Sequence, residues 1–227
     1  MAGVDIGRKR FTPGPQTKMN RSHPLAEAAA VIFVNGVNYT GPPAVAGSGG
    51  GSPSVTPLGA GKASTTAGGE FWSVDVPHVT GSLTAAWFGT KTNVDYNCYW
   101  SQGSGNGVGG AFNMWSDANG TFNCWRAGGS STHAGGNASI DGKTSIIWTH
   151  NVDTDVSVVY LDGQHFSTLT GKTDVGEGSG NPIRIGRRAD GATQLNGTCI
   201  MAGVWRRALS ANEVSMLFAD PFCMLRA

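Results

Sequence analysis

Apolar and polar residues alternate in short runs along most of the chain, and turn-forming residues separate the runs. A two-residue period is typical of β-strands that bury one face. The pairs Asn119-Gly120, Asp141-Gly142 and Asp162-Gly163 predict tight hairpin turns, because these residues tolerate a positive φ. Such a series of short strands predicts an antiparallel sandwich. The runs predict strands at residues 28–34, 71–76, 82–88, 94–100, 111–116, 121–126, 145–149, 155–161, 182–186 and 198–205.

One helix is predicted close to the C-terminus. Ser210 and Glu213 have the spacing of a capping box, in which each side chain binds the backbone N–H of the other residue. Val214, Leu217 and Phe218 then fall on one side of a helix and give it an apolar face. We therefore expect a short helix that packs against the sandwich and has a structural role.

Composition supports this fold class and excludes others. The 227 residues include 35 glycines without a three-residue period, which excludes collagen and fits a chain with many turns. The formal net charge is only +1, so we expect no nucleic-acid partner, which would require a basic stripe. No apolar run approaches the roughly 18 residues of a membrane span, so no membrane partner is expected.

Two segments differ from the strand pattern. Residues 1–24 combine three prolines with one acid and five basic residues, and they predict an extended N-terminal arm before a single domain at 25–227. The arm is either a loose tail or a segment that lies along a neighbouring subunit. Residues 41–69 are mainly Gly, Pro, Ser, Thr and Ala, which predicts a surface loop or a cover over a sheet edge. The basic arm residues are Arg8, Lys9, Arg10, Lys18 and Arg21.

Candidate binding residues come from the alternation between residues 94 and 126. One face of these strands carries Cys98, Trp100, Phe112, Met114 and Cys124, and is predicted to face the core. The opposite face could stack a sugar ring and bind its hydroxyls, form a subunit contact, or lie under another segment of the chain. All three alternatives remain open at this stage. The residues predicted on that opposite face are Tyr99, Trp115, Trp125, Asn97, Asn113 and Asn123.

Metal, thiol and catalytic chemistry find little support. Asp153 and Asp155 are the strongest calcium candidates, with Asp141 and Asp190 in other turns, but aspartate is also common in turns for its own hydrogen bonds. No cofactor is therefore expected. The four glutamates are too scattered to supply a glycosidase pair, and no nucleophile motif accompanies the five histidines, so we expect a non-enzymatic protein. Cys98, Cys124, Cys199 and Cys223 are widely spaced and no export signal precedes them, so free thiols are expected.

The order of motifs near the C-terminus resembles a known family. A tyrosine-containing strand ends in Asp162-Gly163, a short strand ends in Ile185-Gly186, and a Gly-led strand runs into Arg207-Ala-Leu-Ser210. This order is similar to the laminin-G-like, concanavalin A-like jelly rolls, and the resemblance covers about residues 156–222. It implies a two-sheet jelly roll with one short C-terminal helix, whose connection Arg207 would hold. Arg206 and the Arg187-Arg188 pair are expected to be surface charges, with contact to an acidic neighbour as the alternative.

Further resemblances concern function. The ending Ala219-Asp-Pro-Phe222 and the opening His23-Pro-Leu25 resemble virion proteins of tailed phages. Relatives that cleave glycans use a Glu-x-Asp-x-x-Glu strand, which this sequence lacks.

These resemblances imply a virion structural protein, assembled in the host cytoplasm without secretion. The expected role is a capsid decoration or cement protein. It would bind the major capsid protein or other virion proteins through its arm and lateral contacts, as a homo-oligomer or symmetric lattice. The alternative is a carbohydrate-binding adhesin module on a tail or fibre that contacts a host glycan.

Overall fold

A computed structural model of the chain provides the structure. It describes residues 17–34, 36–47, 54–56, 59–63, 71–77, 79–91, 97–103, 112–116, 122–126, 145–170, 182–188, 191, 193, 195 and 197–226.

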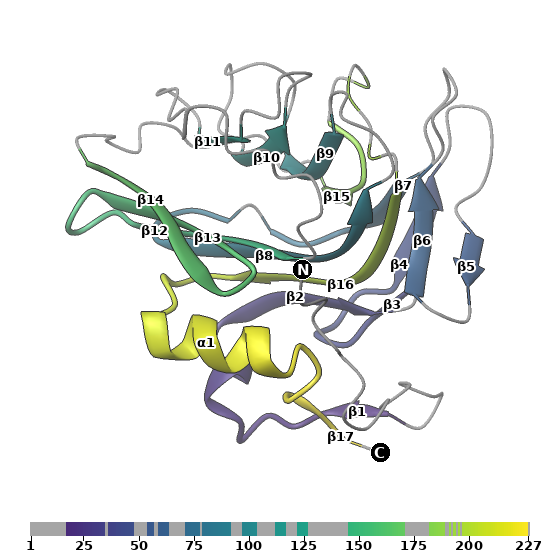
Figure 1. The fold of residues 1–227 in the computed structure, drawn as a ribbon. Coiled ribbons are helices and arrows are strands. Elements are labelled where there is room, and N and C mark those ends of the chain that lie inside the picture. Colours follow the sequence, from purple (N-terminus) through teal and green to yellow (C-terminus); the bar gives the residue numbers. More distant parts are fainter. Residues whose placement is uncertain are drawn as a thin grey trace, which may run out of the picture.

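Two antiparallel sheets face one another and form a sandwich (Figure 1). The first sheet has six strands in the order β11-β10-β9-β15-β7-β4. Their bounds are Phe122–Arg126, Phe112–Ser116, Asn97–Gln102, Ile183–Ile185, Phe71–Val74 and Ala44–Gly47.

The second sheet has its strands in the order β14-β13-β12-β8-β16-β2-β3. Their bounds are Gln164–Thr170, Val156–Leu161, Ser145–Asn151, Leu83–Lys91, Gly197–Trp205, Ala29–Val34 and Val37–Asn38. Strand β6 (Gly59–Ala63) pairs with the first residues of β16, beyond the part of β16 that pairs with β2, and β5 (Ser54–Thr56) pairs with β6. We call this the large sheet.

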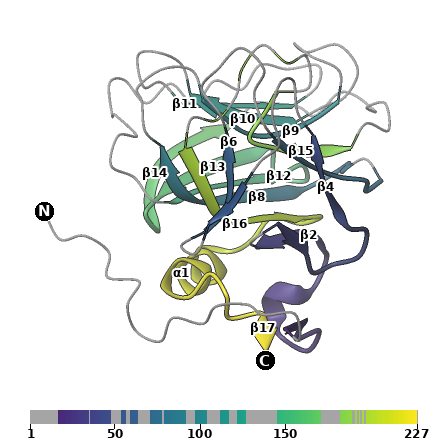
Figure 2. The same ribbon diagram turned by 90° about the vertical axis from the view of Figure 1, so that its right-hand side faces the viewer.

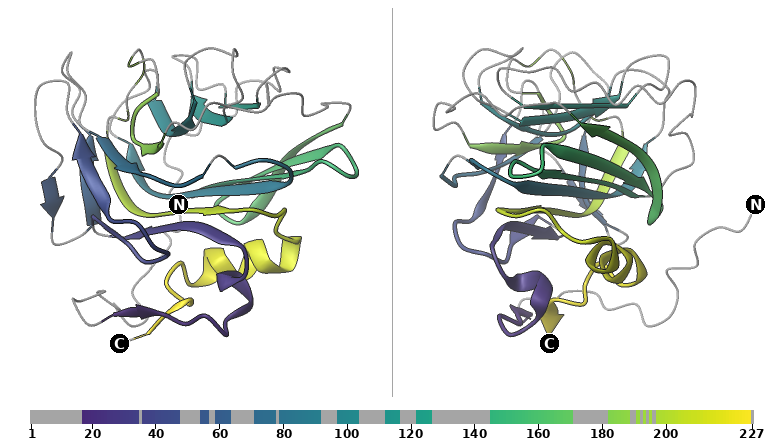
Figure 3. Two further views of the ribbon diagram at one scale, coloured as in Figure 1. Left: turned by 180° about the vertical axis from the view of Figure 1, so that it is seen from behind. Right: turned by 90° about the vertical axis from the view of Figure 1, so that its left-hand side faces the viewer.

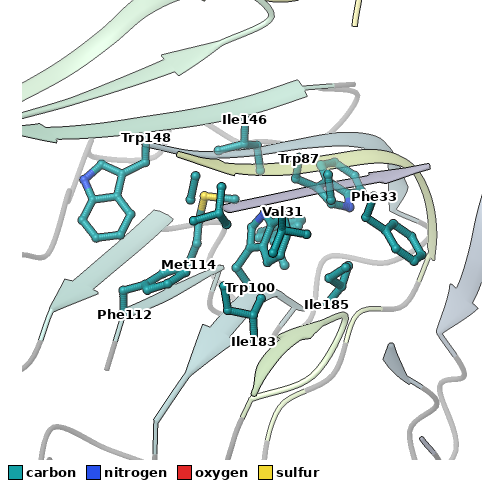
Figure 4. Packing of buried hydrophobic residues seen from close by; sticks show 14 of the residues in the cluster. Val31, Phe33, Trp87, Trp100, Phe112, Met114, Ile146, Trp148, Ile183 and Ile185 are labelled. Carbon is teal, nitrogen blue, oxygen red and sulfur yellow. The ribbon is translucent and has the colours of Figure 1, made fainter. Parts of the chain in front are cut away.

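The main hydrophobic core lies between the two sheets, and Figure 4 shows part of it. Alternate residues of each strand point into it, for example Val31 and Phe33 of β2, as a two-residue period requires. The Trp100 indole N–H donates to the Ala86 carbonyl at 2.8 Å and so joins the two sheets directly. The apolar positions of the alternating pattern in both sheets are therefore the ones that face this core.

A third layer covers the other face of the large sheet (Figure 2). The helix α1 (Ala211–Ala219) packs on it through Val214 and Leu217, and the capping box of Ser210 and Glu213 is present as predicted. The 3₁₀-helix η1 (Pro24–Ala26) adds Leu25 to the same layer. The large sheet is therefore apolar on both faces, since Ile32 and Val34 of β2 point towards this layer.

Both ends of the described chain meet in this third layer. Strand β1 (Lys18–Met19) pairs with β17 (Leu225–Arg226), and the Asn20 N–H donates to the Met224 carbonyl at 2.7 Å. Figure 3 shows both strands on the helix side of the large sheet, far from the six-stranded sheet.

The predicted jelly-roll sandwich is confirmed, and each of the ten predicted strands has a counterpart. The sequence pattern missed β14, because its Gln, His, Ser and Thr residues give it little apolar character at an exposed sheet edge. It also missed the strands between residues 41 and 69, of which β4 extends one sheet and β6 lies beside β16 in the other. That segment therefore covers sheet edges, which was one of its two predicted roles.

The folded domain begins earlier in the chain than the sequence indicated. Residues 17–24, predicted as part of the arm, include β1 and the start of η1, and Met19 packs against the third layer. Lys18 and Arg21 consequently belong to the folded domain. Arg8, Lys9 and Arg10 lie outside the described residues. Two-residue strand pairing gives no alternation to detect, which explains the misplaced boundary.

Candidate functional site

One row of paired residues crosses all six strands of the six-stranded sheet on the face away from the core. The pairing runs from Val45 to Ser73, from Ser73 to Arg184, from Arg184 to Ser101, from Ser101 to Asn113 and from Asn113 to Trp125. Directly paired residues point to the same side of a sheet. The neighbours of these residues along the strands, including Val74, Ile183, Trp100, Phe112 and Cys124, point into the core. We call the side that carries the row the outward face.

A bulge in β9 moves Tyr99 away from this face. Trp100 pairs with Met114, but the next residue of β10, Trp115, pairs with Cys98, so Tyr99 has no partner of its own. An extra residue of this kind reverses the alternation around it. Tyr99 is fully buried, its ring centroid lies 4.8 Å from that of Trp87, and its hydroxyl lies 3.3 Å from Ser116 Oγ. The prediction that Tyr99 faces away from the core was wrong.

The same bulge corrects the placement of Cys98. The sequence predicted this residue on the core face, but its pairing with Trp115 places it on the outward side of β9. Its side chain is buried, and its thiol donates to the Trp100 carbonyl at 3.4 Å.

The other predicted residues divide into two groups. Asn97 is fully buried and pairs with Ser116, which lies on the core side of β10, so the prediction that Asn97 faces away from the core was wrong. Asn113 is 2% exposed and keeps its predicted side of β10. The Asn113 Oδ1 atom accepts no hydrogen bond from the described part of the chain, which is costly for a buried carbonyl oxygen. Trp115 is half-buried and shares the outward face with Asn113, as predicted. Backbone pairing places positions 123 and 125 on this face too, and the side chains of Asn123 and Trp125 lie outside the described part.

Sequence reasoning named Arg187 only as a surface charge and missed that it lies with Arg184 around Phe71 at the other end of the row. The guanidinium carbon of Arg184 lies 5.5 Å from the ring centroid of Phe71, and that of Arg187 lies 5.4 Å from the same centroid. Such distances are those of cation–π contacts. The signal was present in the sequence, because Arg184 stands between two core-facing isoleucines and must point outward.

Within the described part of the chain, no third metal-ligating side chain joins the calcium candidates Asp153 and Asp155. Asp153 and Asp155 lie in the exposed turn between β12 and β13, where the Asn151 side chain accepts hydrogen bonds from the backbone N–H groups of Asp153 and Thr154. Among the residues that the structure describes, no three metal-ligating side chains come together. Asp141 and Asp190 lie outside that part of the chain.

Three of the cysteines, Cys124, Cys199 and Cys223, are unsuited to nucleophilic chemistry. All four are free, and Cys98, Cys124 and Cys199 are buried. Burial raises the pKa of the Cys124 and Cys199 thiols well above the ordinary value. Burial and the nearby Asp220 carboxylate raise the pKa of Cys223 to about 11. These thiols therefore remain protonated near neutral pH.

Comparison with known proteins identifies the family. The concanavalin A-like lectin/glucanases superfamily matches residues 64–215, which is more than half of the chain. The chain belongs to this superfamily. No curated protein matches it. Across the described residues, no helix has both the length and the apolar character that crossing a membrane requires.

Solved structures share the fold at low sequence identity. The binding domain of botulinum neurotoxin DC in complex with rat synaptotagmin II has a TM-score of 0.62 and 11% identity, over 84% of this chain and 51% of that one. A structure from work on cell entry of botulinum neurotoxin type C gives 0.59 and 12%, over 84% and 50%. The Ruminococcus gnavus sialidase module CBM40 gives 0.50 and 13%, over 62% and 84%. This chain thus spans about half the length of the toxin chains.

Proposed function

We propose that this chain is a non-catalytic glycan-binding module whose ligand lies on the outward face of the six-stranded sheet. The observation that carries the proposal is the register row from Arg184 through Ser101 and Asn113 to Trp125. It brings Arg184, Ser101, Asn113 and position 125 onto neighbouring strands of one face. Sugars present apolar ring faces and hydroxyls, which aromatic planes and such hydrogen-bonding groups match.

The buried Asn113 supports a polar ligand. Among the residues that the structure describes, none donates to its Oδ1 atom, and a buried acceptor left in this state costs free energy until a donor reaches it. A sugar hydroxyl is a donor of suitable size. Binding would then satisfy a group that folding leaves unsatisfied.

A binding role fits this face better than glycan cleavage. Glycoside hydrolysis requires two carboxyl groups on either side of the scissile bond. The row consists of Val45, Ser73, Arg184, Ser101, Asn113 and Trp125, and none of these residues is an acid. The superfamily contains both lectins and glucanases, and the chemistry of this row favours the lectin role.

Two of the similar structures support the proposal because they come from proteins that bind glycans. Entry of botulinum neurotoxin type C into cells is described as dependent on two ganglioside molecules. The binding domain of neurotoxin DC is also known in complex with SialylT, at a TM-score of 0.60 and 12% identity. At this identity the likeness shows the fold, and it is the outward row of this chain that carries the proposal.

A glycan array tests the proposal. The purified chain, fluorescently labelled on its amines, is applied to neutral, sialylated, sulfated and uronate-containing oligosaccharides. We expect concentration-dependent binding to a structurally related subset. Absence of binding to every glycan, by a protein with a cooperative thermal unfolding transition, would contradict the proposal.

A second candidate function is a role in the virion of a tailed phage, as a capsid decoration protein or as an adhesin. The position of β1 favours it, because residue 17 leaves the domain on the side of the large sheet remote from the outward face. An arm at residues 1–16 that bound a major capsid protein or another virion protein would attach the domain by the side opposite the six-stranded sheet. This arrangement fits either virion role.

Particle binding tests the second candidate. We expect that the full chain sediments with phage particles and that a variant without residues 1–16 does not. Copy number, measured by mass spectrometry of purified particles, separates a decoration protein in hundreds of copies from an adhesin in tens. Equal sedimentation of both forms would contradict the role of the arm, and absence of the chain from particles would contradict the virion assignment.

A further inference from the structure

Positive charge gathers at the two-stranded sheet of β1 and β17. Lys18 of β1 pairs directly with Arg226 of β17. The next pair, Met19 with Leu225, belongs to the third layer, so positions 18 and 226 lie on the side of the pair that is turned away from this layer. Like charges directly opposite each other in an antiparallel pair destabilise it. We call Lys18, Arg21 and position 226 the basic region.

The charges of this region are not compensated by nearby acids. Lys18 and Arg21 are exposed, and neither makes an ion pair with a residue that the structure describes. Asp220, the acid closest to β17 in the sequence, accepts a hydrogen bond from the Phe222 N–H at 2.9 Å. Residues 1–24 carry five basic residues and one acid, a net charge of +4, which leaves −3 for residues 25–227 because the whole chain is +1. A partner of the basic region must therefore supply negative charge.

Negative charge gathers at the end of the large sheet where β12 and β16 end and β8 begins. The Val152 N–H donates to Ser82 Oγ at 3.0 Å and joins the β12–β13 turn to the residue before β8. Arg206, directly after β16, donates to the Pro77 carbonyl at 2.9 Å through its side chain and to the Ala28 carbonyl at 2.8 Å through its N–H. These bonds bring four acids to one end of the sheet. We call them the acidic end: Glu27, Asp75, Asp153 and Asp155.

The acidic end also lacks compensation within its own copy. Glu27, Asp75 and Asp153 are exposed, and their carboxylates make no ion pair in the described part of the chain. Arg207, which lies beside this end, is already paired with Glu213 of α1 at 2.7 Å. Figures 1 and 3 show the β1–β17 pair and the β12–β13 turn on different sides of the molecule. The two regions therefore do not neutralise each other within one copy.

We infer that this chain associates head to tail, with the basic region of one copy bound to the acidic end of a second copy. Both regions present exposed charges that their own copy leaves unpaired, and the charges are opposite in sign. Opposite charges steer the encounter of two surfaces, and the contact offsets the unfavourable pairing of like charges in β1 and β17. Because the two surfaces differ, every pair keeps one open surface of each kind, and association continues into rings or chains. This inference goes beyond both candidate functions, and neither depends on it.

Sedimentation equilibrium of the full chain tests the inference. Protein concentration is raised to roughly 1 mM. The buffers contain about 0.01 M or about 1 M salt, where the Debye length is roughly 30 Å or 3 Å. In low salt we expect the average mass to rise with concentration beyond that of a dimer. In high salt it should fall back towards that of the monomer.

Matched variants identify the two surfaces. Lys18→Gln with Arg21→Gln neutralises the basic region, and Asp75→Asn with Asp153→Asn neutralises charges of the acidic end. Each double variant should associate at least about tenfold more weakly than the unaltered chain. Gln164→Glu, at an exposed position of β14, lowers the net charge as Lys18→Gln does and should associate like the unaltered chain. Thermal unfolding verifies that each variant folds.

A mixture of the two double variants tests the head-to-tail arrangement. Each double variant keeps one intact surface, so the mixture should form one-to-one dimers and nothing larger. A full chain that stays monomeric at every concentration would overturn the inference. Association that persists in both double variants would do the same, and so would an equal loss in Gln164→Glu, which would assign the effect to net charge. A mixture that associates no more than its separate components would also overturn it.

Discussion

Tyr99 illustrates how a single residue changes its role when a bulge shifts the alternation of its strand. Its ring packs on Trp87 and its hydroxyl pairs with Ser116 inside the core. We predict that Tyr99→Phe lowers the free energy of unfolding by about 1 kcal/mol, the usual worth of one buried hydrogen bond, and leaves glycan affinity unchanged. Chemical denaturation and calorimetry measure the two quantities. A marked loss of affinity with unchanged stability would return Tyr99 to the binding face.

For single residues, the sequence predicted the correct face of a strand wherever the alternation of apolar and polar residues is unbroken. Asn113 and Trp115 face away from Phe112 and Met114, as the two-residue period requires. It failed at Tyr99, because a bulge depends on the pairing partner and leaves no mark in the strand's own residues. Arg184 could have been identified by the same alternation, whereas its neighbour Phe71 required the tertiary structure.

Among the elements, the helix α1 is linked to the N-terminal segment through Arg207, which pairs with Glu213 of the helix and donates to the backbone of that segment. Arg207 donates two hydrogen bonds to Glu213, at 2.9 and 2.7 Å, and a further one to the Pro24 carbonyl at 3.1 Å. The Arg207 side-chain hydrogen bonds, assisted by the Ser210 backbone N–H, hold the pKa of Glu213 at about 2. The expectation that Arg207 holds the helix connection is thus confirmed.

The depressed pKa gives this pair a defined pH dependence. A carboxylate whose pKa is lower in the folded state stabilises the fold above its unfolded pKa and loses that contribution as pH falls towards the folded value. We predict that Glu213→Gln costs roughly 1–2 kcal/mol at pH 7, through loss of the ion pair and part of the capping box. The difference from the unaltered chain should shrink between pH 4.5 and 2. Urea denaturation across this range measures it, and a constant difference would contradict the assigned pKa.

A second prediction concerns the contribution of the β1–β17 pair to stability. We expect that residues 1–16 do not stabilise the domain, so a chain without them should unfold at the same urea concentration as the full chain. Removal of residues 1–22 deletes β1 and Met19, and should cost roughly 1–3 kcal/mol through lost backbone hydrogen bonds and apolar burial. Equal stability of the two truncated forms would show that β1 contributes little.

At the scale of the whole molecule, the fold was predictable and the position of the ends was not. Alternation and turn residues identified the sandwich, and the capping box identified α1. The third layer, which joins η1, α1 and β17 on the large sheet, depends on contacts between distant segments. This layer places β1 and β17 on the side of the large sheet that faces away from the six-stranded sheet (Figure 1).

The glycan affinity of a Trp125→Ala variant tests the central claim most directly. Trp125 is on the outward face by its pairing with Asn113, and Met216→Ala on the exposed side of α1 provides the control. With the strongest glycan from the array, we predict that Trp125→Ala weakens binding about tenfold, through the lost stacking and apolar contact, and that Met216→Ala binds like the unaltered chain. Unchanged affinity in a folded Trp125→Ala protein would contradict the placement of the glycan on this face.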